Sequence, residues 1–89
     1  VVGIVVDQMR QDYLYRFNNK FSAGGFKRLT ANGYSLTNAH YNYAPTYTGP
    51  GHASIYTGTS PAIHGIIGND YYDKETKKII NCVADARYS

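Results

Sequence analysis

The stretch PTYTGPGHASIYTG, residues 45–58, is a loop that runs into the start of a helix. Such a junction needs one capping Ser or Thr, and Thr48 is placed to provide the cap. Gly49, Pro50 and Gly51 follow, which keep side chains away and leave backbone N–H groups bare. Because bare amides at a helix start favour negative charge, we expect a small anionic group to approach the Thr48 hydroxyl.

Outward from this junction, strands and helices alternate. Residues 1–7, VVGIVVD, form a continuous β-branched apolar run, typical of a strand buried on both faces of a parallel sheet. The predicted elements are, in order, a strand at 1–7, helices at 10–17 and 24–32, a strand at 34–43 and a helix at 48–58. Gly33 stands where a left-handed helix cap is wanted. This order predicts an α/β fold, in which ligands lie at the carboxyl ends of the strands.

The carboxyl-terminal part has a different pattern. Residues 59–69 are a turn region punctuated by glycines, and residues 71–83, YYDKETKKIINCV, predict a β-hairpin that turns at Lys74 to Thr76. The whole sequence therefore predicts the amino-terminal part of a mostly parallel sheet flanked by helices, with a β-hairpin near the carboxyl end. A two-stranded hairpin is marginal alone, so we expect it to rest on a part of the protein outside these 89 residues.

Composition excludes several classes of protein. The hydrophobic share of 43% argues against disorder, and a net charge of +3 without a basic and aromatic stripe argues against nucleic-acid binding. No apolar run is long enough to span a membrane. With Cys82 as the single cysteine, no internal disulfide can form. The chain begins inside the first predicted strand, so we expect both termini to be internal to a longer chain, with any secretion signal removed or upstream.

Two residues with useful chemistry are predicted to meet at one edge of the sheet. Asp7 ends the first strand and Thr48 follows the second, so both should reach the carboxyl edge. A threonine hydroxyl is a weak nucleophile at neutral pH, and metal coordination activates it by stabilising the alkoxide. A carboxylate is a natural ligand for the same ion. In isolation, Asp7 is equally compatible with a structural role as a cap or loop-ordering group, and Thr48 is more typical of an ordinary N-cap.

Three motifs together resemble the alkaline phosphatase superfamily. They are VVGIVVDQMR at residues 1–10, PTYTGPGHASIYTG at 45–58 and SPAIHGIIGNDYYD at 60–73. Their wording is most similar to the PafA-type periplasmic alkaline phosphatases, neighbours of the nucleotide pyrophosphatase/phosphodiesterases. The motifs stand in family order and nearly span the chain, so the resemblance covers the amino-terminal portion of a larger catalytic domain.

The resemblance implies roles for three residues. Asp7 would bind zinc, and Thr48 would be the nucleophile that becomes phosphorylated and contacts the same zinc. Asn69 would hold a phosphate oxygen, and the backbone N–H of Thr48 would also face the phosphate. A complete site would contain two zinc ions, whose other ligands, mostly Asp and His, lie outside this sequence. The lysine and arginine typical of monoester cleavage would also lie beyond Ser89.

The resulting prediction is zinc-dependent hydrolysis of small-molecule phosphate monoesters through a phosphothreonine intermediate, in the periplasm or outside the cell. Two alternatives stay open: cleavage of phosphodiesters or pyrophosphates, and a non-catalytic binding module that keeps the fold. The 89 residues alone are expected to be inactive, and the oligomeric state is not readable. His52 and His64 match no family ligand, so we expect structural hydrogen bonds from them, and Cys82 is interpreted as a small packing residue.

Overall fold

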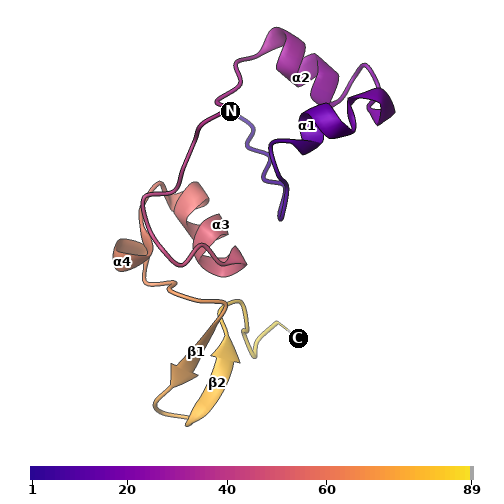
Figure 1. Cartoon of the computed structure of the whole chain (residues 1–89). Coiled ribbons are helices and arrows are strands. Elements are labelled where there is room, and N and C mark those ends of the chain that lie inside the picture. The colour runs from indigo at the N-terminus through magenta and orange to yellow at the C-terminus, as the bar shows by residue number, and fades with distance from the viewer. Residues whose placement is uncertain (89) are drawn as a thin grey trace. The chain divides into compact units, whose positions relative to one another are not determined.

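The computed structural model describes residues 1–88 and divides into two compact units, Val1–His40 and a second that begins at Tyr41 (Figure 1). The first unit contains α1 (Tyr13–Arg16), the 3-10 turn η1 (Asn18–Lys20) and α2 (Phe26–Asn32). The second contains α3 (Thr48–Thr57), α4 (Pro61–His64), β1 (Asp70–Asp73) and β2 (Lys78–Asn81). Both helices predicted before residue 34 are therefore confirmed, in shorter form.

Gly33 ends α2, but not in the predicted way. Its backbone is extended, with φ −112° and ψ −168°, so the prediction of a left-handed cap was wrong. The Gly33 N–H still bonds the Leu29 carbonyl oxygen at 2.9 Å. A Cβ on Gly33 would lie 2.6 Å from that same oxygen. Glycine is needed here because the chain passes too close to the last helical turn for any side chain.

Neither predicted parallel strand is paired in the described part of the chain. Residues 1–7 and 34–43 contain no strand, and β1 and β2 form the sheet. A strand needs a neighbour to receive its backbone hydrogen bonds, and residues 1–88 supply none for these segments. The apolar side chains of the predicted first strand are correspondingly uncovered, with Val2 89% and Ile4 78% exposed.

In the second unit, α3 ends at Thr57, one residue before the predicted end. Gly58 takes a left-handed conformation with φ 68°, and its N–H bonds the Ser54 carbonyl oxygen at 2.9 Å. Ser54 is buried and its Oγ lies 2.9 Å from Nε2 of His64, at the end of α4. Nδ1 of the same ring accepts the Ile66 N–H at 3.1 Å. His64 therefore joins the two helices and the turn after them, which confirms its expected structural role.

The predicted hairpin is also confirmed. β1 pairs antiparallel with β2, in a register that sets Asp70 opposite Asn81 and Asp73 opposite Lys78. Asp73 orders the turn by accepting the N–H groups of Glu75 and Thr76 at 3.2 and 3.1 Å, together with the Thr76 hydroxyl. The Thr76 hydrogen bonds hold the pKa of the Asp73 carboxyl below its usual value.

These residues form little core of their own. Within residues 1–88, no large hydrophobic side chain is buried. The largest side chain of any kind that is fully buried there is that of Pro50, in α3. None of the helices described here has the length and apolar character needed to cross a membrane. The buried residues of the described chain are Pro50 and Ser54 of α3 and Pro61 of α4.

Candidate functional site

Thr48 is the first residue of α3 rather than its cap. Tyr47 is the N-cap residue, with extended backbone and no capping side-chain hydrogen bond, so the prediction of Thr48 as N-cap was wrong by one position. The change matters chemically, because a capping hydroxyl would be occupied by a backbone amide. Within the described residues, Thr48 Oγ1 makes no hydrogen bond, and the residue is exposed.

The backbone amides at the start of α3 are less bare than the sequence suggested. Gly49 donates its N–H to Asn69 Oδ1 at 2.7 Å, Pro50 has no N–H, and Gly51 donates to the Tyr47 carbonyl oxygen at 2.8 Å. The Thr48 N–H is left without a partner among residues 1–88. One amide, on the same residue as the free hydroxyl, is therefore available to an anion.

Asn69 lies just before β1, and its side chain is turned by the bond to Gly49. A side-chain amide has one accepting oxygen and one donating NH₂ group. Since Oδ1 receives the Gly49 N–H, the NH₂ group of Nδ2 points elsewhere, and it has no partner in the described chain. The main chain of Asn69 is held as well, because its carbonyl oxygen accepts the Cys82 N–H at 2.7 Å.

The sequence did not indicate that Gly49 and Cys82 contact Asn69 and each other. A Cβ on Gly49 would lie 2.8 Å from Cys82 Sγ, 3.2 Å from Asn69 Oδ1 and 3.3 Å from the Gly68 carbonyl oxygen. The glycine is required because three groups converge on its Cα. One signal was in the sequence, since glycine beside a functional residue marks a close approach, but its partners are 19 to 33 residues away.

Asp7 lies in the first unit, and its position relative to Thr48 is not determined. It is exposed, in the turn that precedes α1, and its carboxylate has no ion pair or hydrogen bond to another described residue. A carboxylate without a partner is free to ligate a cation. The structure thus brings Thr48 and Asn69 together, whereas the place of Asp7 beside them stays a prediction.

The described residues do not hold a metal on their own. Nowhere in residues 1–88 do three or more His, Cys, Asp or Glu side chains gather closely enough to bind one. The histidines nearest the helix start are engaged elsewhere: Nδ1 of His52 lies 2.9 Å from the Thr48 carbonyl oxygen, and both ring nitrogens of His64 are hydrogen-bonded. Asp7 and Thr48 are oxygen donors of a type that zinc accepts, but they are fewer than the four ligands of a usual site.

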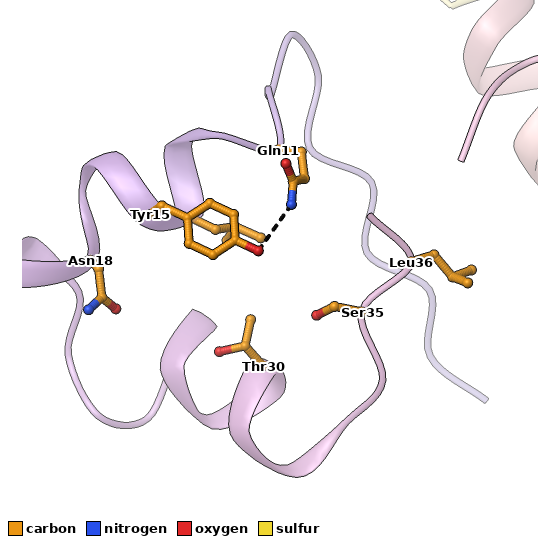
Figure 2. Close-up of a pocket in the computed structure, with 7 residues that line it drawn as sticks. Gln11, Tyr15, Asn18, Thr30, Ser35 and Leu36 are labelled. Carbon is orange, nitrogen blue, oxygen red and sulfur yellow. Dashed lines mark hydrogen bonds between the residues drawn. The ribbon is translucent and has the colours of Figure 1, made fainter. Parts of the chain in front are cut away.

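A pocket in the first unit contains none of the predicted site residues. Figure 2 shows its lining, with Gln11 Nε2 3.2 Å from the Tyr15 hydroxyl and with Asn18, Thr30, Ser35 and Leu36 around the space. All the lining side chains are uncharged. The pocket therefore offers no positive charge to a phosphate, and none of the predicted roles is assigned to it.

The chain is similar in sequence to curated alkaline phosphatases. The chain is 60% identical over 85 residues to alkaline phosphatase PafA of Elizabethkingia meningoseptica and 54% identical over 85 residues to alkaline phosphatase PhoV of Synechococcus elongatus. Each match covers 96% of this chain and 16% of the relative. This chain thus spans about a sixth of the length of the curated relatives it matches.

Solved structures agree. The crystal structure of wild-type PafA matches with a TM-score of 0.82 and 58% identity, over 93% of this chain and 16% of that one. A PafA variant with four substitutions matches with a TM-score of 0.82 and 56% identity, over 92% of this chain and 16% of its own. A sequence model of the type I phosphodiesterase / nucleotide pyrophosphatase family matches residues 1–88, and the chain belongs to that family.

Proposed function

We propose that the full-length protein carrying this sequence is a phosphatase that hydrolyses small-molecule phosphate monoesters, with Thr48 as its nucleophile. The observation that carries the proposal is the arrangement at the start of α3. Thr48 has a hydroxyl and an N–H without hydrogen-bond partners in the described chain, and the Gly49 N–H next to it holds Asn69 by Oδ1, which leaves the Asn69 NH₂ group free. These are the groups needed to attack phosphorus and to hold the oxygens of a phosphoryl group.

The reaction proceeds in two displacements. In the first, Thr48 Oγ1 forms a bond to phosphorus as the bond from phosphorus to the ester oxygen breaks, the hydroxyl proton is released and the leaving group departs as an alcohol. In the second, water attacks the phosphothreonine, which frees inorganic phosphate and restores the hydroxyl. In both, Asn69 Nδ2 and the Thr48 N–H donate to non-bridging oxygens, whose charge they stabilise.

Two zinc ions complete the proposed site. Asp7 and the Thr48 oxygen would ligate one of them, and the remaining ligands would come from outside this sequence. Bound zinc supplies Lewis-acid chemistry: it lowers the cost of deprotonating the hydroxyl and neutralises phosphate charge. For Asp7 and Thr48 to meet, residues 1–7 and 34–43 would have to become neighbouring parallel strands of the complete domain, and this pairing is part of the proposal.

The separation of Thr48 and Asn69 supports their assignment. The solved PafA variant replaces a threonine and, 21 residues further along its chain, an asparagine. Thr48 and Asn69 are also 21 residues apart. The same variant replaces a lysine and an arginine two positions apart, the pair that the resemblance associates with monoester cleavage. Together with the names of PafA and PhoV, this favours monoesters over the diesters named by the family.

The proposed setting rests on the resemblance to the periplasmic alkaline phosphatases. Residues 1–89 would be the amino-terminal portion of a larger alkaline-phosphatase-like catalytic domain, working in the periplasm or as a secreted enzyme. The substrate would be a small phosphate ester, and nucleic acid is not proposed as a structural partner. A binding module that keeps the fold without catalysis is the remaining alternative. Asp7, Thr48 and Asn69 argue against it, because each is of a residue type that can perform its proposed catalytic role.

Assay of the full-length protein tests the proposal. We expect kcat/KM to be higher for an aryl phosphate monoester than for the matching diester. We also expect mass spectrometry of acid-quenched enzyme to find phosphate on the peptide that contains Thr48. Preference for the diester would favour the phosphodiesterase alternative. Hydrolysis of neither ester, with zinc bound and the protein folded, would favour the binding module.

A further inference from the structure

The proposed reaction does not explain what holds the side-chain amide of Asn69 in one of its two orientations. An asparagine side chain can rotate by half a turn and exchange its oxygen with its NH₂ group. The proposed role needs the NH₂ group toward the phosphate. The Gly49 N–H, 2.7 Å from Oδ1, selects this orientation. After a half-turn, the NH₂ group would face the Gly49 N–H, so two donors would meet and the hydrogen bond would be lost.

The backbone of Asn69 is held from the opposite side. The Cys82 N–H donates to the Asn69 carbonyl oxygen at 2.7 Å, one position beyond the pairing of Asp70 with Asn81. Asn69 is therefore fixed at the end of the hairpin by its main chain, and at the head of α3 by its side chain. These two bonds connect segments that are 13 and 20 residues apart in the sequence.

The Cys82 side chain sets how closely the two segments approach. Its Sγ would lie 2.8 Å from a Cβ on Gly49, so the half-buried thiol packs directly against the Gly49 Cα. A larger group on either residue would separate the start of α3 from the hairpin. Because Thr48 adjoins Gly49, that separation would change the distance between nucleophile and phosphate donor.

We propose that Gly49 and Cys82 are positioning residues for the phosphate-binding side chain of Asn69. Gly49 orients the amide through its backbone N–H, and the contact of its bare Cα with the Cys82 thiol sets the distance from the Asn69 NH₂ group to the Thr48 hydroxyl. Neither residue touches the substrate. The inference rests on the proposed function, because it gives these contacts a role in phosphoryl transfer.

A double-mutant cycle in the full-length enzyme tests this coupling. Asn69→Ala should lower kcat/KM for an aryl phosphate by about a hundredfold, and Gly49→Ala by about ten- to a hundredfold through misplacement of the amide. If Gly49 acts through Asn69, the double variant should be within about threefold of Asn69→Ala alone. Losses that multiply would overturn the positioning role, since Gly49→Ala would then damage something else.

Gly51→Ala is the matched control. It adds the same methyl group two residues further along α3, where, apart from the neighbouring residues and the backbone of α3 itself, no atom lies within 4 Å of the new Cβ. Its kcat/KM should stay within about twofold of wild type. A loss equal to that of Gly49→Ala would mean that any added methyl group disturbs the helix start, and the specific role of Gly49 would be overturned.

A suppressor variant tests the thiol contact. Cys82→Ala removes Sγ and leaves the Asn69 Oδ1 and Gly68 oxygens as the nearest atoms to the new Cβ, at 3.2 and 3.3 Å. The pair Gly49→Ala with Cys82→Ala should therefore be more active than Gly49→Ala alone. Equal or lower activity would remove Cys82 from the proposal. If Gly49→Ala does not fold, Cys82→Leu places a larger side chain against Gly49 from the hairpin, and its activity should be lower than that of Cys82→Ala.

The cycle also separates this inference from the proposed function. Full activity in Asn69→Ala would overturn the role of Asn69 in the reaction, and the positioning role with it. A large loss in Asn69→Ala, combined with multiplying losses in the double variant, would overturn the positioning role and leave the proposed function in place. Equal zinc content and similar thermal midpoints across the variants show that the comparison is between folded enzymes.

Discussion

The two units of this chain differ in the sequence separation of the residues that their internal hydrogen bonds join. In residues 1–40, the hydrogen bonds join groups at most four residues apart, such as Thr30 to Phe26 and Asn38 to His40. In the second unit, bonds join Gly49 to Asn69, Ser54 to His64 and Asn69 to Cys82. The proposed nucleophile therefore lies among residues that fix one another, whereas the proposed metal ligand Asp7 depends on parts of the protein beyond these residues.

The largest effect that this comparison predicts concerns the 89-residue chain by itself. Its first unit leaves Val2 and Ile4 uncovered, and no large hydrophobic side chain of the described residues is buried. We therefore expect the isolated chain to be aggregated or largely unfolded and to show no phosphatase turnover. Circular dichroism during heating, with and without zinc, measures this. A cooperative transition from a soluble monomer would show instead that the residues form an autonomous domain.

Within the full-length enzyme, the largest effect is expected at Thr48. Thr48→Ala removes the hydroxyl and leaves the helix start, so kcat for an aryl phosphate should fall by several orders of magnitude. Thr48→Ser keeps a hydroxyl at the same position and should retain substantial activity. Steady-state kinetics on the two variants measure the difference. An alanine variant with nearly wild-type turnover would show that another group is the nucleophile.

Asp7 and Asn69 should differ in what they hold. Asp7→Ala should lower the zinc content measured by elemental analysis, because it removes a ligand. Asn69→Ala should leave zinc in place and weaken only the binding of the phosphoryl group, by roughly 3 kcal/mol in the transition state. Equal zinc content in the two variants would remove Asp7 from the ligands.

The features that the sequence predicted well are those with local causes. The helix after Tyr47 and the hairpin turn at Lys74 to Thr76 depend on residues within a few positions of one another, so their patterns are readable. The N-cap was predicted at Thr48 but is Tyr47, whose side chain makes no capping hydrogen bond, so the preference for Ser and Thr at this position did not decide where the helix begins. Gly33 was predicted to be left-handed, but it is required by the nearness of the Leu29 oxygen.

Features with distant causes could not be predicted in the same way. The predicted strands at residues 1–7 and 34–43 need partners that the described chain does not supply. Resemblance singled out Asn69, but nothing in its surroundings in the sequence indicates that Gly49 would orient it. Contacts between residues this far apart in the sequence depend on the fold, and a glycine does not by itself indicate which residue will contact it.

The smallest effect, and the closest test of the difference between the units, compares two histidines. His64 is half-buried, and its ring bonds the hydroxyl of Ser54, ten residues away on α3, as well as the Ile66 N–H two residues away. His40 is exposed, and its Nε2 lies 2.7 Å from the side chain of Asn38, two residues away. His64→Ala leaves a buried hydroxyl and an amide without partners and should cost about 1–3 kcal/mol of unfolding free energy. His40→Ala should change it by at most about 0.5 kcal/mol. Denaturant unfolding of the full-length protein measures both, and equal losses would show that long-range bonds do not distinguish the two regions.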